Sequence, residues 1–306
     1  MGSTATPTPA IPLAATVLLL RESTQGLQVL MTKRAAGLSF MAGLWVFPGG
    51  RLEAADEAPA IAARILGLET VVAATPCMLG LDGQPIAEST ALALHVAACR
   101  ETFEESGVLL ARPGPGARSE RDTGRLARID AARAAASDAA AFVRLLEAED
   151  LWLDVGQLVY WSHWITPSFE KKRFDTRFFA VAVAADQAAS VDRSELTHHA
   201  WLTEREVREH LRSGDMKVAP PTIATLQDLW ACHARHGSVT AMLAAERGRS
   251  VPPILPKLRP VAGGAAEIVL PWDPEYASLG GESCVVAERY PDYLLALPSR
   301  RTFIAR

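Results

Sequence analysis

Two short apolar runs separated by a polar turn open the hydrophobic pattern of the chain. The runs are Ala14–Arg21 and Leu27–Lys33, and the polar residues Glu22–Gly26 lie between them. Runs of this length joined by a short polar loop predict a β-hairpin at the start of a sheet. Trp45–Phe47 is expected to be a further short strand, which ends at Pro48 and leads into a tight turn made of two glycines.

Strand-like segments are followed by helix-like segments in the second half of the chain. Three strands and then two helices are expected, at Leu158–Ile165, Arg173–Ala184, His198–Leu202, Glu204–Leu211 and Pro221–His233. Ile129–Ala148 is rich in alanine and leucine and predicts one long helix. His198 and His199 are consecutive on their strand and point to opposite faces, so we expect one to be buried and the other exposed.

One predicted helix has an apolar side and an acidic side. Its apolar positions are spaced four, three and four residues apart, which suits packing on a core. They are Leu92, Val96, Cys99 and Phe103. Ser89 or Thr90 is expected to cap the first turn of this helix. Thr203 is expected to cap the predicted helix Glu204–Leu211 in the same way. Gly107 suits the C-terminus, because glycine readily adopts the left-handed conformation that ends many helices.

The acidic side of this helix carries Glu101, Glu104 and Glu105. At about 100° per residue, these three carboxylates fall within roughly one-third of the helix circumference. Carboxylates this close repel one another in water, and they become favourable when they share hard divalent cations, which prefer oxygen ligands. The alternative from these residues alone is an amphipathic helix with a solvated acidic stripe.

Composition narrows the class of protein. Of 306 residues, 49% are hydrophobic and 22% charged, as in a soluble globular protein. The net charge of −4 gives no reason to expect a nucleic-acid partner. No apolar run approaches the roughly 18 residues of a membrane helix, so we expect no membrane partner. The four cysteines form no C-x-x-C pair, which indicates reduced thiols, and the expected location is the cytoplasm.

The acidic helix resembles the second half of the Nudix box. Arg100–Val108 matches the pattern R-E-U-x-E-E-x-G-U, with U aliphatic, and Phe47–Gly50 resembles the loop that opens the box. Asp56 stands where the family has a glutamate. Between Asp56 and Arg100 lie 43 residues against seven in the family, so 36 residues, 57–92, form an insertion. Its first part, Ala58–Leu68, has helical composition, and Val71–Glu88 is expected to be irregular.

The resemblance implies an α/β (α+β) fold, a Nudix-type α/β/α sandwich with a mixed sheet. We expect residues 13–250 to form this domain, with the helical insertion inside the box. Residues 1–12 are expected to be a mobile tail, and the proline-rich residues 251–306 an extension packed on the core.

The resemblance also implies catalytic residues and a cofactor, Mg²⁺ or Mn²⁺. Glu101, Glu104 and Glu105 map onto the metal ligands, and Arg100 maps onto an arginine that orients a glutamate. Gly50 would let the backbone approach the helix. Asp56 is expected to be structural or to have no role. Glu195 matches the position of a fourth acid, with a solvated loop charge as the alternative.

Further segments resemble one branch of the family, the peroxisomal coenzyme A diphosphatases of the Nudix motif 19 type. These are Phe40–Gly43, Trp164–Pro167, Arg173–Phe179, Pro220–Thr222 and Leu270–Asp273. Leu30–Ala36 partly resembles the signature that precedes the box in coenzyme A diphosphatases more widely. In the wider group of coenzyme A diphosphatases an arginine stands where this chain has Phe40. The substrate-binding residues expected from the resemblance are Arg34, Gly49, Gly50 and Arg173, with Lys171, Lys172, Trp161 and Trp164 as further candidates. Surface lysines and core tryptophans are the alternatives for the last four.

The predicted function is therefore a metal-dependent diphosphatase that splits CoA or acyl-CoA into 3′,5′-ADP and (acyl-)4′-phosphopantetheine. One alternative is the same chemistry on ADP-ribose, NADH or another nucleoside diphosphate derivative. The other is a Nudix-fold binding or regulatory module without turnover, against which the intact glutamates argue. The expected partner is a small CoA-like nucleotide, and a homodimer is left open.

Overall fold

A computed structural model of the protein describes residues 11–114, 124–135, 138–190, 196–261, 266–284 and 290–303. The predicted tail, residues 1–12, lies outside this part of the chain except for its last two residues. Glu195, the candidate fourth acid, lies outside it as well.

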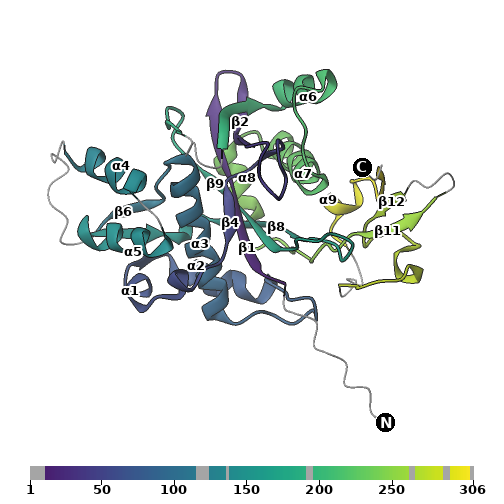
Figure 1. Ribbon diagram of the computed structural model, residues 1–306, viewed down its shortest axis with the longest axis horizontal. Coiled ribbons are helices and arrows are strands. Elements are labelled where there is room, and N and C mark those ends of the chain that lie inside the picture. Colours follow the sequence, from purple (N-terminus) through teal and green to yellow (C-terminus); the bar gives the residue numbers. More distant parts are fainter. Residues whose placement is uncertain are drawn as a thin grey trace, which may run out of the picture.

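A seven-stranded mixed sheet forms the centre of the molecule (Figure 1). Five strands lie in the order β10-β2-β1-β9-β8, with β3 beside β2 and β4 beside β1. Strand β1 pairs in parallel with β9, and the other pairs are antiparallel. In chain order the strands are β1 (Leu13–Ser23), β2 (Gly26–Arg34), β3 (Trp45–Val46), β4 (Gly49–Arg51), β8 (Val159–Ile165), β9 (Asp175–Ala182) and β10 (Leu196–Thr203).

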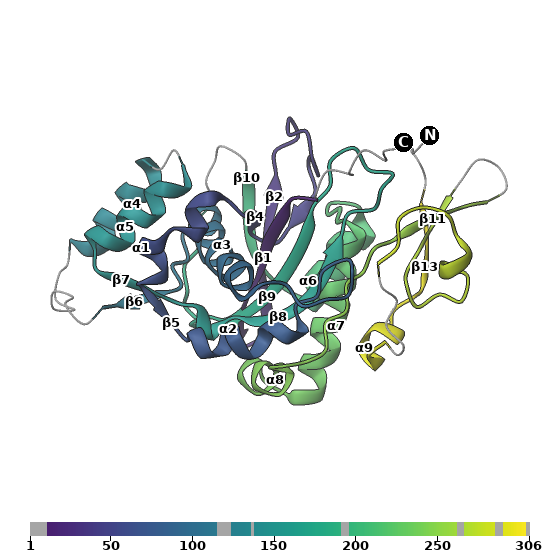
Figure 2. The same cartoon turned by 90° about the horizontal axis from the view of Figure 1, so that it is seen from below.

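Helices cover both faces of this sheet (Figures 1 and 2). Successive side chains of a strand point to opposite faces. Val17 and Leu19 of β1 accordingly join the core beneath α3 (Glu88–Ser106). Leu18 and Leu20 join the core beneath α7 (Pro220–His236) and α8 (Val239–Glu246). The predicted α/β/α sandwich is confirmed.

Helix α3 is buried on most of its surface, including Val96, Cys99 and Phe103 of the predicted apolar side. Its predicted cap is wrong. The helix begins at Glu88, so Ser89 and Thr90 lie inside its first turn, and the N-cap residue is Ala87, which offers no side-chain hydrogen bond. Gly107 ends the helix as predicted, with a φ of 72° and its N–H donating to the carbonyl of Phe103.

The insertion is a folded layer beside α3 rather than a helix followed by irregular chain. Ile61, Val71 and Met78 are fully buried in the same core as α3. The predicted helix over Ala58–Leu68 is interrupted, because α1 ends at Ala62 and a short strand follows it. A new helix then begins after Gly67, which is in the left-handed conformation, and extends to Ala74, into the segment expected to be irregular. The layer contains η1 (Ala54–Glu57), α1 (Pro59–Ala62), β5 (Ile65–Leu66), α2 (Leu68–Ala74) and η2 (Thr75–Cys77).

The predicted long helix at Ile129–Ala148 is in fact two helices, α4 (Arg125–Ala135) and α5 (Ala139–Ala148). Asp138 begins the second one, because its carboxylate accepts a hydrogen bond from the N–H of Ala141 at 2.9 Å. A capping carboxylate competes with helix continuation. After α5 the chain forms β7 (Leu151–Asp154), between β5 and β6 (Ala111–Pro113), and then η3 (Val155–Gln157).

The histidine pair also differs from expectation. His198 and His199 are both exposed, because β10 is an edge strand with its pairing shifted between Leu196 and His198. Thr203 caps α6 (Glu204–Ser213) as predicted, by accepting a hydrogen bond from the N–H of Glu206.

The C-terminal extension packs on the core through Ile268, Leu270 and Leu294, which lie in the same cluster as α7. It also forms a small sheet of its own, with a buried lysine, Lys257, whose ammonium donates to two backbone carbonyls. Its elements are β11 (Lys257–Pro260), β12 (Ala266–Val269), η5 (Tyr276–Ser278), α9 (Asp292–Leu295) and β13 (Arg300–Phe303). All four cysteines are free thiols. In the part of the chain described, no helix has the length and apolar character to cross a membrane.

A buried ionic cluster joins the central sheet to the insertion. Arg177 has no exposed surface; its guanidinium lies 2.7 Å from the carboxylate of Asp175 and donates to the carbonyl of Leu79 in the insertion. His163 contacts the same carboxylate at 2.5 Å. Burial works against ionisation of Asp175, but His163 and Arg177 outweigh it and lower the pKa of this carboxyl. The cluster therefore holds a charged pair inside the protein.

We expect Arg177→Met to destabilise the fold by about 3–5 kcal/mol, because it leaves the Asp175 carboxylate buried without its cation. Urea denaturation measures this loss. The control is Arg144→Met, in which an exposed arginine paired with Asp138 is removed and the loss should stay below about 1 kcal/mol. Equal losses in the two variants would contradict the prediction.

Candidate active site

Strand β4 seats the acidic helix against the sheet. Gly49 and Gly50 were expected to form a turn, but they are extended and pair with Thr16 and Ala15 of β1. Side chains would not fit at either position. A Cβ atom on Gly49 would lie 2.7 Å from the Cα of Thr16, and one on Gly50 would overlap the carboxylate of Glu101. The two glycines are therefore required for close approach of the strand to β1 and to the helix.

The guanidinium of Arg100 is the centre of the site. Its side chain is only 3% exposed. It binds the Asp56 carboxylate in a bidentate manner, from Nε to Oδ1 at 2.7 Å and from Nη2 to Oδ2 at 3.0 Å. Nη1 donates to Oε1 of Glu101 and to Oε2 of Glu104, each at 2.8 Å. Nη2 also donates to the carbonyl of Arg51 at 2.9 Å.

Asp56 contacts Arg100 from η1, the short helix at the start of the insertion. Its Oδ2 also accepts a hydrogen bond from the N–H of Glu53 at 2.8 Å, so the carboxylate is fixed from both sides. From the sequence, Asp56 was expected either to have a structural role or to have no role. Its contacts with Arg100 and Glu53 support a structural role. Arg100 likewise has the contacts of an orienting arginine. It binds Asp56 and Glu101 in addition to Glu104, which lies four residues further along the helix.

The site carries more negative than positive charge. One guanidinium faces the three carboxylates of Asp56, Glu101 and Glu104. Burial raises the pKa of Glu101 to about 7, with a further rise from Glu104, although Arg100 acts in the opposite direction. Burial also raises the pKa of Glu104 above its usual range. The ionised forms of both glutamates are therefore incompletely compensated by the protein itself.

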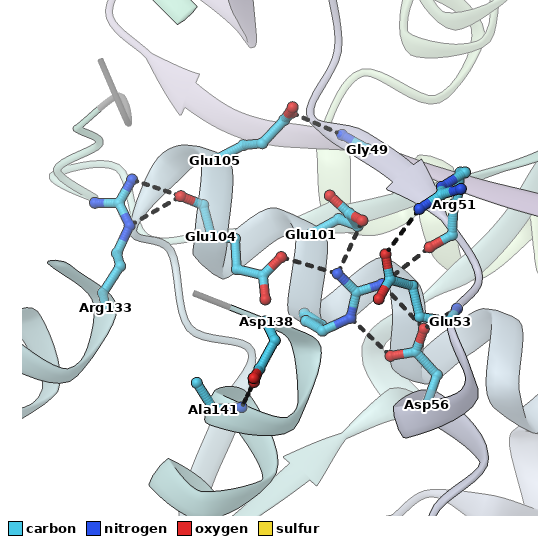
Figure 3. Close-up of polar contacts among 11 residues, drawn as sticks. Gly49, Arg51, Glu53, Asp56, Glu101, Glu104, Glu105, Arg133, Asp138 and Ala141 are labelled. Carbon is cyan, nitrogen blue, oxygen red and sulfur yellow. Dashed lines mark hydrogen bonds and ion pairs between the residues drawn. The ribbon is translucent and has the colours of Figure 1, made fainter. Parts of the chain in front are cut away.

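Glu105 lies apart from the other two glutamates. Its Oε2 accepts a hydrogen bond from the N–H of Gly49 at 2.9 Å, as Figure 3 shows, whereas Glu101 and Glu104 pair with Arg100. The structure thus brings Glu101 and Glu104 together and places Glu105 one strand position away, at Gly49 rather than Gly50. Among the described residues, no three acidic, histidine or cysteine side chains are already close enough to hold a metal ion.

The donor set nonetheless fits a hard divalent cation. Glu101, Glu104 and Glu105 offer carboxylate oxygens, the ligands that Mg²⁺ and Mn²⁺ prefer. The excess negative charge and the raised pKa of Glu101 are what a cation bound there would offset.

The other residues predicted to bind substrate include two arginines, Arg173 and Arg34, and two tryptophans, Trp161 and Trp164. Arg173 donates from Nε to the carbonyl of Thr166 at 2.9 Å and also pairs with Glu282, so it joins the sheet to the C-terminal extension. Arg34 lies at the end of β2, where its backbone N–H donates to Leu44. Trp161 and Trp164 are buried in the core against α7, the alternative that the sequence had left open.

Arg133 was not singled out from the sequence. From α4, its guanidinium donates twice to the carbonyl of Glu104, at 3.1 and 3.0 Å (Figure 3). It also donates to Ser190. Carbonyls of the last helical turn lack intrahelical partners, and a cation there is favourable. Arg133 therefore fixes the end of α3 that carries the glutamates. A long-range contact of this kind leaves no local motif in the sequence.

A mixed sheet between helices, with an R-E-x-x-E-E helix seated on a glycine strand, defines a Nudix-type hydrolase domain. The sequence profile of the NUDT19 Nudix domain matches residues 4–229. The chain belongs to the NUDT19 Nudix family.

Curated relatives agree with this assignment. The acyl-coenzyme A diphosphatase NUDT19 of Homo sapiens is 30% identical over 228 residues, which cover 64% of this chain and 59% of the human protein. The putative nudix hydrolase 7 of Caenorhabditis elegans is 26% identical over 231 residues, 74% of this chain and 64% of the relative. The chain thus spans about three-fifths of the length of these relatives.

Among solved structures, a NUDIX hydrolase from Alicyclobacillus acidocaldarius is 28% identical, with a TM-score of 0.56. The match covers 73% of this chain and 92% of the bacterial chain. The similarity therefore extends over most of the described fold.

We expect Gly50→Ala to weaken Mn²⁺ binding by about tenfold or more, because the added methyl group displaces the Glu101 carboxylate. The free energy of unfolding should fall by no more than about 1–3 kcal/mol, the usual cost of overpacking. Titration calorimetry with Mn²⁺ measures the affinity, and urea denaturation the stability. Gly37→Ala is the control, since a Cβ there meets open space. An unchanged Mn²⁺ affinity in Gly50→Ala would show that Glu101 is not a ligand.

Proposed function

We propose that this protein is a metal-dependent diphosphatase that hydrolyses CoA or acyl-CoA to 3′,5′-ADP and (acyl-)4′-phosphopantetheine. The observation that carries the proposal is the half-buried carboxylate cluster of α3, which is held by Arg100 and in which negative charge exceeds positive charge. The names of the vertebrate relatives, acyl-coenzyme A diphosphatases, support this choice of substrate.

The residues of the chain have distinct parts in this chemistry. Glu101, Glu104 and Glu105 would hold Mg²⁺ or Mn²⁺, which supplies positive charge against the diphosphate and polarises water. Arg100 orients Glu101 and Glu104 through its two 2.8 Å contacts. The N–H of Gly49 positions Glu105.

The residue that departs from the coenzyme A diphosphatase pattern, Phe40, has a cation beside it. Its ring lies edge-on to Phe174 with centroids 5.2 Å apart. The ammonium of Lys172 is 6.0 Å from the centroid of Phe40 and 5.9 Å from that of Phe174. We infer that Lys172 takes over the role of the missing arginine toward the phosphates of CoA.

We also propose a cytoplasmic location, because four free thiols suit a reducing compartment. Homodimerisation remains a prediction, and light scattering after size-exclusion chromatography would decide it.

Incubation with CoA, ADP-ribose and NADH, each with Mg²⁺, Mn²⁺ or EDTA, tests the substrate. We expect metal-dependent release of 3′,5′-ADP and phosphopantetheine from CoA, identified by mass spectrometry. AMP from ADP-ribose or NADH with CoA untouched would keep the metal site and reject the CoA assignment. No cleavage of any substrate would favour a binding module.

Glu104→Gln and Glu105→Gln are each expected to lower kcat by at least about tenfold, because each removes a metal-binding charge. Steady-state kinetics with CoA and Mg²⁺ measures the loss. Glu147→Gln, at an exposed position of α5, is the control and should retain full activity. Near-normal turnover in both site variants would refute the ligand assignment.

A further inference from the structure

A cavity lies across the sheet from the carboxylate cluster. It has a volume of about 570 Å³ and is bounded by α6, α7 and the β1–β2 turn. Figures 1 and 2 show α6 and α7 on the opposite side of the central sheet from α3. We call this cavity the α6 groove. Its principal lining residues are Leu27, Arg205, Arg208, Arg212, Trp230 and His233.

Helix α6 places three arginines along this groove. Arg205, Arg208 and Arg212 are spaced three and four residues apart, so they share one side of the helix. A different side, with Val207 and Leu211, packs into the core. Within the described part of the chain, the guanidinium groups of Arg205 and Arg212 have no hydrogen bond or salt bridge. Their hydrogen-bond donors are therefore available to a ligand.

The middle arginine is held in place by the protein. Arg208 pairs with Glu204 at 2.7 Å, and its guanidinium carbon lies 5.2 Å from the ring centroid of Trp230. Trp230 is only 5% exposed and gives the groove a rigid aromatic wall. Glu204 is the only carboxylate among the lining residues, against three arginines. The groove thus carries net positive charge, whereas the carboxylate cluster of α3 is net negative.

We propose that the α6 groove binds a phosphorylated nucleotide at a second site, independent of the metal and of the glutamates. Arginine forks bind phosphate oxygens in a bidentate manner, which favours phosphate over other anions. The volume lies within the range of about 300–1,000 Å³ that small-molecule sites occupy. Trp230 and Leu27, which are 5% and 6% exposed, form part of the apolar lining beneath the arginines. The choice of adenosine 3′,5′-bisphosphate as the probe rests on the proposed function. The proposal that the groove binds a phosphorylated nucleotide does not depend on that function.

Titration calorimetry with the full-length protein in EDTA tests the proposal, with adenosine 3′,5′-bisphosphate and inorganic phosphate as separate probes. We expect the nucleotide to bind more tightly than phosphate. The double variant Arg205→Gln/Arg212→Gln should bind the nucleotide at least about tenfold more weakly, because charge-assisted hydrogen bonds are lost. Arg144→Gln, on the far side of the sheet, should bind as the wild type does.

Glu104→Gln separates this site from the carboxylate cluster, and it should bind the nucleotide with wild-type affinity in EDTA. Loss of binding in Glu104→Gln but not in the arginine variant would overturn the groove proposal and leave the diphosphatase proposal intact. Binding that depends on the arginines in a protein that cleaves no CoA would reject the diphosphatase proposal and support the groove. No binding to the wild type, or equal affinity for nucleotide and phosphate, would overturn the proposal.

Discussion

The contact between the buried guanidinium of Arg100 and three carboxylates is the interaction on which the site depends. A carboxylate taken out of water is unfavourable unless a cation or hydrogen-bond donors face it. Asp56, Glu101 and Glu104 all meet this requirement through the same side chain. Because Asp56 belongs to a different chain segment, the contact also fixes the helix relative to the loop after β4. Loss of this one cation would leave the buried Asp56 and the half-buried Glu101 and Glu104 without a cationic partner.

This arrangement explains how the box tolerates 36 additional residues. The entropic cost of a longer loop rises slowly with its length, so the insertion itself costs little. The conformation of the insertion affects the site only where the insertion begins and ends. Asp56 binds Arg100 at the first of these points, and the carbonyl of Leu79 accepts a hydrogen bond from buried Arg177 further along. Between these contacts, Ile61 and Val71 bury the layer against α3.

The two faces of the sheet differ in charge as well as in the helices that cover them. The α3 face holds excess carboxylate charge that suits cations, whereas the α6 groove presents arginines that suit anions. Under the proposed function, a diphosphate substrate would need a metal at the first site, whereas a phosphorylated nucleotide would bind the second without one. The fold therefore separates two regions of opposite charge by a layer of sheet.

Local pattern in the sequence was sufficient for the β1–β2 hairpin, the acidic helix and its end at Gly107, because periodicity and glycine conformation depend on neighbours in the chain. The sandwich itself was implied by the resemblance to the Nudix family. The motif also located Arg100 and the three glutamates. Their convergence was not predictable in detail: Glu105 binds Gly49, and Arg133 closes the helix from 29 residues away in sequence. The exposure of both His198 and His199 follows from the edge position of β10, and the pairing of Arg173 with Glu282 from the fold of the extension. Such features arise from contacts between residues distant in sequence, so only the tertiary structure decided them.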